Sequence, residues 1–538
     1  MRHPPERAEF DALIVGAGFA GLYMLHRLRG LGLTARVLEQ GEDVGGTWYW
    51  NRYPGARCDI ESLDYSYSFS EELQQEWCWS ERFASQAEIL RYADHVAERF
   101  DLRRDIQFNT RVTAAAYDDA AGTWTLTTDD GERLTAQFCI MATGCLSVPQ
   151  EPSYPGLERF QGRRYQTGRW PHEPVEFTGQ RVAVIGTGSS AIQSIPIIAT
   201  QAEQLYVFQR TPNFSVPAWN APLDPERERA VKAEYDAFRQ RARESRSGFV
   251  GYPNEHAEQP ALAVTAAERE AEYERRWAIG GLGLTGAFAD LLRDQEANDT
   301  VAEFVRAKIL AIVHDPAVAE LLMPRDYPAG TKRLCVDTNY YATFNRPNVM
   351  LLDLHRAPIE EIIPHGLRTT ETEYELDSIV FAIGFDAMTG ALLRIDIRGR
   401  DGERLADRWA NGPRSYLGLT VAGFPNLFMI TGPGSPSVLS NMMVSIEQHV
   451  EWVSDCIAYL HERGIRAIEA TPEAEDEWVA HANEVADATL YPRAKSWYMG
   501  ANIAGKPLGF LPYVGGVGAY RRRCDEIAAN GYEGFELS

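Results

Sequence analysis

Residues 10–21 read FDALIVGAGFAG, and this stretch decides which fold the sequence predicts. Its first six residues form a short apolar run, as in a buried parallel strand, and a helical pattern follows over 22–31. The two are joined by a GxGxxG turn, made of Gly16, Gly18 and Gly21. The first glycine permits the tight turn, the second lets the backbone approach a pyrophosphate, and the third lets helix and strand pack closely. The stretch therefore predicts a dinucleotide-binding domain.

Glu39 indicates which dinucleotide this first site prefers. It ends the next predicted strand, 35–38, where a carboxylate can accept hydrogen bonds from ribose hydroxyls but would repel a 2′-phosphate. The site therefore suits FAD or NAD and disfavours NADP. The segment 45–59, GGTWYWNRYPGARCD, is too irregular for a helix, and its aromatic side chains and Arg57 suit a wall beside a planar ring. This favours FAD, and a surface loop with buried aromatic residues is the alternative.

A β-meander is predicted inside this domain, because DDAAG and DDG turns separate the strand-like segments 112–117, 124–128 and 133–135. A further strand at 138–141 then returns to Gly144. A glycine after a returning strand lets the backbone pass close to a bound cofactor, so Gly144 is a candidate contact.

A second strand–turn–helix pattern begins at residue 181 and reads RVAVIGTGSSA. It predicts a second nucleotide site at the start of the following helix. The candidate cofactor contacts there are Gly186, Gly188, Ser189, Ser190 and Gln193.

The strand that follows, 205–208, distinguishes the second site from the first. Arg210 and Thr211 stand where an NAD site would carry a carboxylate. An arginine can pair bidentately with a phosphate and a threonine can donate its hydroxyl, so the site is predicted to bind the 2′-phosphate of NADP. A solvated surface arginine is the alternative for Arg210.

The predicted fold class is α/β, with two Rossmann-like dinucleotide-binding domains and a mostly helical insertion. Helical periodicity dominates 222–324, and we interpret its charge runs as solvated helix faces. A second returning strand at 374–385 would close the NADP domain. The predicted boundaries are 1–150 and 387–538 for the two parts of the FAD domain, 151–221 and 328–386 for those of the NADP domain, and 222–327 for the insertion.

The composition excludes several classes of function. The net charge is −23, whereas a nucleic-acid partner needs concentrated Lys and Arg. No apolar run reaches the roughly 18 residues that span a bilayer, and residues 1–10 have no apolar signal core, so we expect a cytoplasmic protein without membrane association. The seven cysteines lack CxxC spacing, so we expect reduced thiols and no metal site.

Two nucleotide sites, one for FAD and one for NADPH, imply hydride transfer to a bound flavin. A disulfide reductase would pass the electrons to a redox-active cysteine pair, but the chain has no CxxC or CxxxxC motif. Oxygen is therefore the expected electron acceptor. Lys332 and Arg333 stand side by side before a predicted strand, which indicates either open solvent or a shared anionic target.

Residues 160–171, FQGRRYQTGRWP, resemble the fingerprint FxGxxxHxxxWP of type I Baeyer-Villiger monooxygenases, and 45–59 fit a second pattern of that family, GGxWxxxxYPGxxxD. The likeness covers nearly the whole chain. The tryptophan separates this fingerprint from those of flavin-containing and N-hydroxylating monooxygenases, and glutamine replaces its histidine. We interpret the segment as a connector and hinge that follows NADP binding. Its fingerprint residues are Phe160, Gly162, Gln166, Trp170 and Pro171.

The resemblance implies an enzyme that uses NADPH, tightly bound FAD and O2 to convert a ketone to an ester or lactone through a C4a-peroxyflavin, with secondary sulfoxidation. It implies that Arg333 stabilises the anionic oxygen intermediates and that Asp59 orients it. Arg210, Thr211 and Lys332 would hold NADPH, and Gly46, Thr47, Trp48 and Asp59 would contact the FAD. We expect a monomer.

The resemblance also places the substrate, without identifying the ketone. Trp497, in a glycine-rich loop, resembles the mobile family residue over NADP and substrate, with ordinary packing as the alternative. The loop 432–443 is expected to select the ketone through Ser437, Val438, Leu439 and Met442. Two other functions stay open: a flavin-containing monooxygenase that oxygenates N or S, and an NADPH oxidase that releases hydrogen peroxide.

Overall fold

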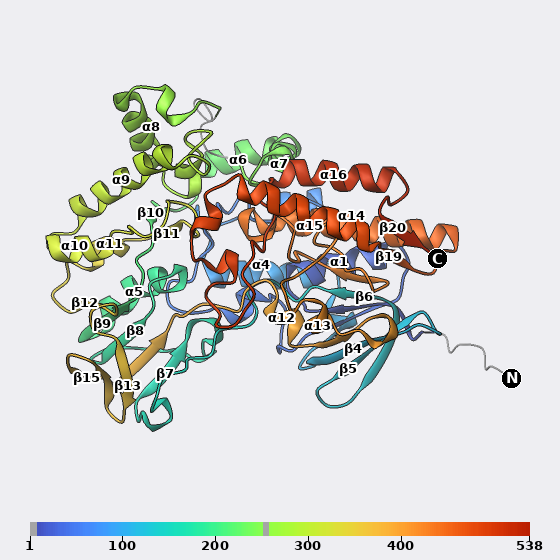
Figure 1. The fold of residues 1–538 in the computed structure, drawn as a ribbon, viewed down its shortest axis with the longest axis horizontal. Coiled ribbons are helices and arrows are strands. Elements are labelled where there is room, and N and C mark those ends of the chain that lie inside the picture. Colours follow the sequence, from blue (N-terminus) through green and yellow to red (C-terminus); the bar gives the residue numbers. More distant parts are fainter. Residues whose placement is uncertain (1–7, 251–257) are drawn as a thin grey trace.

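The computed structural model describes residues 8–250 and 258–538, and Figure 1 shows how they are arranged. Two sheets, each with a parallel core, organise the chain. The first has the strand order β17-β4-β5-β6-β1-β2-β3, and β18 also pairs with β6. Its strands are β1 (Phe10–Val15), β2 (Ala35–Leu38), β3 (Ile106–Gln107), β4 (Val112–Asp118), β5 (Thr123–Thr128), β6 (Arg133–Met141), β17 (Asp396–Arg398) and β18 (Leu427–Met429).

The carboxyl ends of this sheet meet at one edge. Val15 is paired with Leu38 on one side and with Met141 on the other, and Met141 is paired with Met429. Ligands of open α/β sheets bind at this edge. Helix α1 (Phe19–Gly30) starts here, directly after Gly18, so Gly21 of the first glycine turn lies in its first turn.

Strand β6 corrects the prediction of two separate strands at 133–135 and 138–141. The structure has one continuous strand whose first half pairs antiparallel with β5 and whose second half pairs parallel with β1. Alternating burial in the first half gives way to continuous burial in the last four residues. The two halves therefore look like different strands, because one is covered on one face only and the other on both.

The second sheet has the strand order β12-β9-β8-β16-β7. Its strands are β7 (Arg163–Gln166), β8 (Arg181–Ile185), β9 (Gln204–Gln209), β12 (Val349–Asp353) and β16 (Ser378–Phe381). The predicted strand 374–385 is wrong in extent, because β15 (Glu373–Glu375) turns away into a small antiparallel sheet with β13 (Ile359–Ile363) and β14 (Gly366–Thr369). Asp377 lies between β15 and β16 (Ser378–Phe381). Its carboxylate accepts a hydrogen bond from the backbone N–H of Arg181 at 2.8 Å.

The predicted helical insertion is confirmed. Its helices are α6 (Pro225–Ala233), α7 (Tyr235–Glu244), α8 (Ala266–Ile279), α9 (Gln295–Ile312) and α10 (Pro316–Leu322). Helices α8, α9 and α10 each follow an N-cap residue whose side chain accepts a hydrogen bond from a backbone N–H of the first turn. These residues are Thr265, Asp294 and Asp315. Not every charge in this region is solvated, because Glu272 and Arg276 form a buried ion pair of 2.6 Å.

The C-terminal helices α14 (Met442–Arg463), α15 (Pro472–Asp487) and α16 (Val517–Ala529) lie together above the first sheet in Figure 1, where α14 contacts α1. Other elements include α2 (Thr47–Trp50), α3 (Glu71–Glu76), α4 (Gln86–Arg99), α5 (Ser189–Gln201), β10 (Ser215–Pro217), β11 (Cys335–Asp337), α11 (Tyr340–Thr343), α12 (Gly390–Leu393), α13 (Leu405–Arg408), β19 (Ile468–Ala470) and β20 (Phe535–Leu537). Among the helices of the described ranges, none is long and apolar enough to cross a membrane. The seven cysteines are free thiols.

Candidate active site

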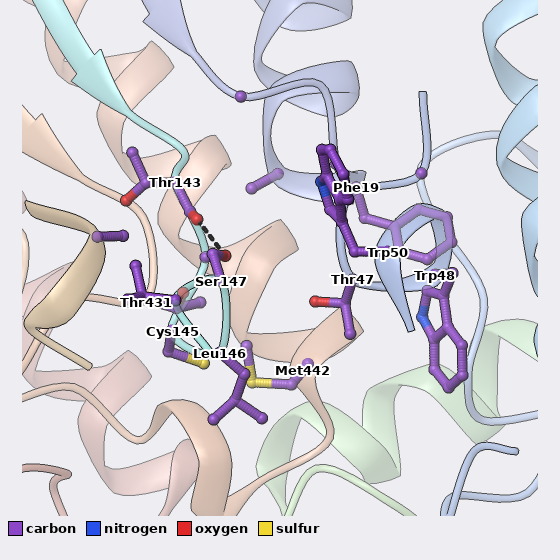
Figure 2. Close-up of a pocket in the computed structure, with 18 of the residues that line it drawn as sticks. Phe19, Thr47, Trp48, Trp50, Thr143, Cys145, Leu146, Ser147, Thr431 and Met442 are labelled. Carbon is purple, nitrogen blue, oxygen red and sulfur yellow. Dashed lines mark hydrogen bonds between the residues drawn. The ribbon is translucent and has the colours of Figure 1, made fainter. Parts of the chain in front are cut away.

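A cavity of about 500 Å³ lies at the carboxyl edge of the first sheet and reaches the start of α5. Figure 2 shows part of its wall, with Phe19, Trp48 and Trp50 from the N-terminal region and Thr143, Thr431 and Met442 from later segments. Many of the residues predicted to contact cofactor or substrate line it: Gly16, Gly18, Glu39, Gly46, Thr47, Trp48, Asp59, Gly144, Ser189, Gln193, Arg333, Val438, Met442 and Trp497.

The first glycine turn is packed so closely that two of its positions admit only glycine. Gly16 has a φ of 107°, and a Cβ there would lie 2.6 Å from the carbonyl oxygen of Ala142. Gly21 does not line the cavity, and a Cβ on it would overlap the carbonyl oxygen of Gly16. The turn therefore leaves no room for side chains, which keeps the N-terminus of α1 open to a phosphate.

Glu39 both supports this turn and faces the cavity. Its carboxylate accepts from the backbone N–H of Ala17 and of Gly41, each at 2.7 Å. Burial raises the pKa of Glu39, and the two hydrogen bonds act against that rise. Each carboxylate oxygen still has a lone pair for a ribose hydroxyl.

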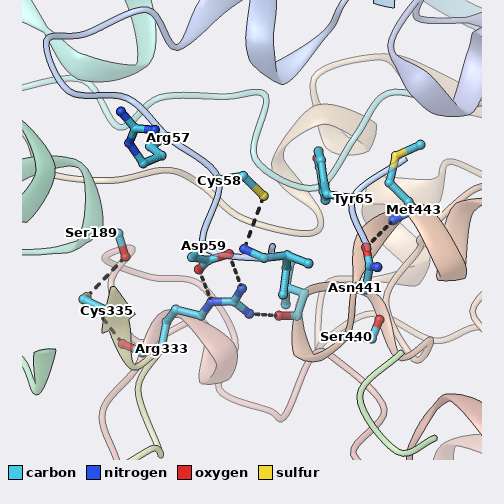
Figure 3. A network of polar contacts seen from close by, with 12 residues as sticks. Arg57, Cys58, Asp59, Tyr65, Ser189, Arg333, Cys335, Ser440, Asn441 and Met443 are labelled. Carbon is cyan, nitrogen blue, oxygen red and sulfur yellow. Dashed lines mark hydrogen bonds and ion pairs between the residues drawn. The ribbon is translucent and has the colours of Figure 1, made fainter. Parts of the chain in front are cut away.

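Arg333 and Asp59 form a bidentate pair on the cavity wall, shown in Figure 3. Nε donates to Oδ2 at 2.9 Å and Nη2 donates to Oδ1 at 2.8 Å, while Nη1 donates to the Val438 carbonyl at 2.7 Å. Burial lowers the pKa of Arg333, but the neighbouring groups that raise it, Asp59 first among them and then Tyr498 and Cys58, together outweigh that effect, and the net shift is upward. The guanidinium therefore stays charged, and it keeps further N–H donors, because arginine has five.

The second nucleotide turn lies at the start of α5. Gly186 has a φ of 115°, and a Cβ on Gly188 would meet no atom within 4 Å, so the backbone is open to a ligand. Ser189 and Gln193 line the large cavity, whereas Gly186, Gly188 and Ser190 do not. One helix thus contributes to both the cavity and the second turn.

Arg210, Thr211 and Lys332 do not line the cavity, and Arg210 and Thr211 directly follow the end of β9. The turn and Thr211 are joined, because Thr187 Oγ1 donates to the Thr211 carbonyl at 2.9 Å. Burial and the nearby Arg210 charge lower the pKa of Lys332, so the two cations lie close together. No carboxylate in the described residues pairs with Arg210 at ion-pair distance. Two cations this close together beside the turn suit a phosphate group.

Gln193 joins the two nucleotide domains. Its Oε1 accepts from the Tyr53 hydroxyl at 2.8 Å, and its Nε2 donates to the Arg57 carbonyl at 3.0 Å. The amide thereby holds the loop that leads to Asp59. The start of α5 is therefore connected by hydrogen bonds to the loop that carries Asp59, the partner of Arg333.

Segment 160–171 also touches both domains. Gln166 Nε2 donates to the Gln150 carbonyl at 2.7 Å, and Thr167 Oγ1 lies 3.0 Å from Ser190 Oγ. Gly168 and Arg169 line the cavity. Phe160, Gly162, Gln166, Trp170 and Pro171 do not line it, and Trp170 stacks on Tyr165 with ring centroids 5.2 Å apart. The hinge function stays a prediction.

The substrate loop is placed only in part as its sequence predicts. Val438 and Met442 line the cavity, but Ser437 is fully buried, and Leu439 packs against a buried apolar cluster that includes Tyr498 and Leu511. Thr431 lines the cavity although sequence reasoning missed it. It follows β18, and the rule that ligands bind beyond the carboxyl ends of parallel strands could have found it.

Comparison with known proteins identifies relatives over the full length of the chain. Residues 13–238 match the family model described as pyridine nucleotide-disulphide oxidoreductase. A Baeyer-Villiger monooxygenase of Pseudooceanicola batsensis is 43% identical, with 98% of this chain and 96% of that protein covered. A phenazine N-monooxygenase of Lysobacter antibioticus is 42% identical, with 99% and 98% covered.

Solved structures agree with these relatives. An oxidized steroid monooxygenase bound to NADP has a TM-score of 0.94 and 53% identity, with 98% of this chain and 99% of that chain covered. The complex of OTEMO with FAD and NADP has a TM-score of 0.95 and 42% identity, with 99% and 100% covered. These likenesses confirm the predicted fold class of two Rossmann-like domains. The chain therefore belongs to the Baeyer-Villiger monooxygenases, the family that its motifs predict.

Proposed function

We propose that this enzyme uses NADPH and O2 to convert ketones of the aryl, cyclic or steroid-like kind to esters or lactones. The observation that carries the proposal is the Arg333–Asp59 pair on a cavity that also contains the first glycine turn and the start of α5. Family membership gives the reaction type, and the pair gives a charged donor at the place where a reacting ketone would lie.

The residues of the cavity fit FAD, and those beside α5 fit NADP. The first glycine turn would hold the FAD pyrophosphate, Glu39 its ribose, and Trp48 would stand beside the ring system. Arg210 and Lys332 would hold the 2′-phosphate of NADPH. When bound, FAD reduced by NADPH would supply the activated oxygen.

Arg333 would act by electrostatic stabilisation. When an oxygen nucleophile adds to a ketone carbonyl, negative charge develops on the carbonyl oxygen, and a fixed N–H donor lowers the energy of that state. Asp59 holds the plane of the guanidinium with two hydrogen bonds, and the Val438 carbonyl holds its third nitrogen. The donor is therefore oriented before the reaction begins.

The test is Arg333→Ala, with the exposed Arg241→Ala as the matched control. NADPH oxidation and ester formation are measured separately with a small cyclic and an aryl ketone. We expect Arg333→Ala to oxidise NADPH and release hydrogen peroxide, with ester formation about 10²- to 10³-fold lower. Undiminished ester formation would overturn the role given to Arg333.

Oxygenation of N or S is a second candidate, supported by the similarity to a phenazine N-monooxygenase. We propose sulfoxidation as a side activity of the same cavity. Transfer of oxygen to sulfur or nitrogen creates no oxyanion on a carbonyl, so it has less need of Arg333. A thioether and a tertiary amine should be tested beside the ketones. Faster turnover of either, undiminished in Arg333→Ala, would favour the second candidate, and peroxide without any product would favour an NADPH oxidase.

A cytoplasmic location and a monomeric state stay predictions. Size-exclusion chromatography with light scattering would decide the second, because a monomer of 60.3 kDa is expected.

A further inference from the structure

We propose that His449 is a positioning residue of the active site, which holds the Thr431 turn of the cavity wall in shape. The proposal rests on the proposed function, since it takes the cavity to be the FAD site. His449 lies within α14 and has no contact with solvent. It does not line the cavity itself.

The contact between the two residues is a single buried hydrogen bond. The backbone N–H of Thr431 donates to Nδ1 of His449 at 2.9 Å. A backbone N–H can only donate, so Nδ1 must be unprotonated and the proton of the neutral ring must be on Nε2. Burial lowers the pKa of His449 to about 3, and the nearby Arg521 charge acts in the same direction. The imidazole therefore stays an acceptor at neutral pH.

Thr431 needs such support because of its backbone. It has a φ of 58°, in the left-handed region that a β-branched residue rarely adopts. It is nearly fully buried and lines the cavity, where Figure 2 labels it with Cys145 and Met442. Without the imidazole its N–H would be buried and unpaired, and the turn would relax toward an ordinary conformation.

The turn is connected to the catalytic arginine. Ser437 Oγ donates to the Thr431 carbonyl at 3.5 Å, and Ser437 has a φ of 37°. The next residue is Val438, whose carbonyl accepts from Arg333 Nη1 at 2.7 Å. A shift of the Thr431 turn would therefore reach both the flavin wall and one of the groups that orient Arg333.

Among the described residues, only Nδ1 of the imidazole makes a hydrogen bond. Within the described part of the chain, Nε2 has no hydrogen-bond partner, and the Tyr520 ring lies 5.5 Å from the imidazole, centroid to centroid. Asparagine places its Oδ1 at nearly the position of Nδ1, whereas leucine has a similar size and no acceptor. The two substitutions therefore separate the hydrogen bond from packing.

The experiment compares His449→Asn and His449→Leu with His461→Leu, a substitution of an exposed histidine on the same helix. The dissociation constant for FAD and the visible spectrum of the bound flavin are measured without ketone. We expect affinity for FAD to fall about tenfold in His449→Leu, with a shifted spectrum, and to stay within about threefold in His449→Asn and His461→Leu.

A folded His449→Leu protein with wild-type affinity and spectrum would overturn the proposal. Equal loss in His449→Asn and His449→Leu would also overturn it, because the acceptor would not be the reason. If His449→Leu does not fold, His449→Asn decides: it must keep FAD with a wild-type spectrum. Failure of the wild type to bind FAD would instead refute the proposed function, so the two failures are distinguishable.

Discussion

Asp59→Asn tests how much the orientation of Arg333 contributes to the ester formation that we propose. The substitution keeps the size of the side chain and removes its charge. An amide has one oxygen, so it can accept one of the two N–H groups at 2.9 and 2.8 Å, and its NH2 group would face the other. The guanidinium would keep the Val438 carbonyl as a partner but lose its fixed plane.

The size of the effect follows from the partly exposed position of the pair. A hydrogen bond to a charged group contributes roughly 1.5–3 kcal/mol, and solvent screening lowers that value when the pair is accessible. The exposed fractions of the side chains are 22% for Arg333 and 26% for Asp59, so we take about 2 kcal/mol. At about 1.4 kcal/mol for each factor of ten, ester formation should fall about 30-fold.

The assay follows NADPH consumption by absorbance and ester formation by gas chromatography in the same reaction. We expect NADPH oxidation to change less than about threefold, so most of the reducing equivalents should appear as hydrogen peroxide. Glu320→Gln is the control, because Glu320 forms a similar two-bond pair with Arg325 on the surface. Unchanged ester formation in Asp59→Asn would refute the reasoning, as would an equal loss in the control.

Three further outcomes are expected. The wild type, with Gln166 in place of the family histidine, should be active. Gln166→Leu should lower the fraction of NADPH used for oxygenation, because the hydrogen bond to the Gln150 carbonyl is lost. A wild type that is inactive, and whose activity Gln166→His restores, would show instead that an imidazole is essential. Arg210→Ala should raise the KM for NADPH about tenfold and leave that for NADH unchanged, and equal effects on both would contradict a 2′-phosphate contact. Burial raises the pKa of Asp337 to about 6, above its unfolded value of 3.8. Its stabilising contribution is therefore fully present below the unfolded pKa and is lost as the pH rises through about 6. The stability of Asp337→Asn should depend less on pH between 4 and 7 in chemical denaturation than that of the wild type, and parallel pH profiles would contradict this.

The two glycine turns could be predicted because their requirements are local. A Cβ on Gly16 would collide with the backbone of Ala142, the residue after β6, so this close approach requires the glycine that the motif contains. Glu39 and Arg210 are likewise predicted as site residues from their distance along the chain from those turns, and their contacts with a nucleotide stay predictions. Arg333 and Asp59 are 274 positions apart, so only the family resemblance linked them.

The remaining features depend on tertiary context. The hydrogen bond between Thr431 and His449 could not be predicted from the local sequence, because a histidine in a helix has many possible neighbours in the folded protein. The burial of Ser437 is likewise not visible in the local sequence, because it accompanies a positive φ that the sequence does not predict. The extent of β6 was misjudged because its two halves have different neighbours.

The two hydrogen bonds of Gln193 bear on how this enzyme could be recombined with its relatives. One amide on α5 binds both Tyr53 and the Arg57 carbonyl, which belong to the other nucleotide domain. A chimera that exchanges the NADP-binding part alone would place a foreign helix against this loop. The unit that can be transplanted is therefore larger than the Rossmann fold, and it includes residues 53–57 of the first domain.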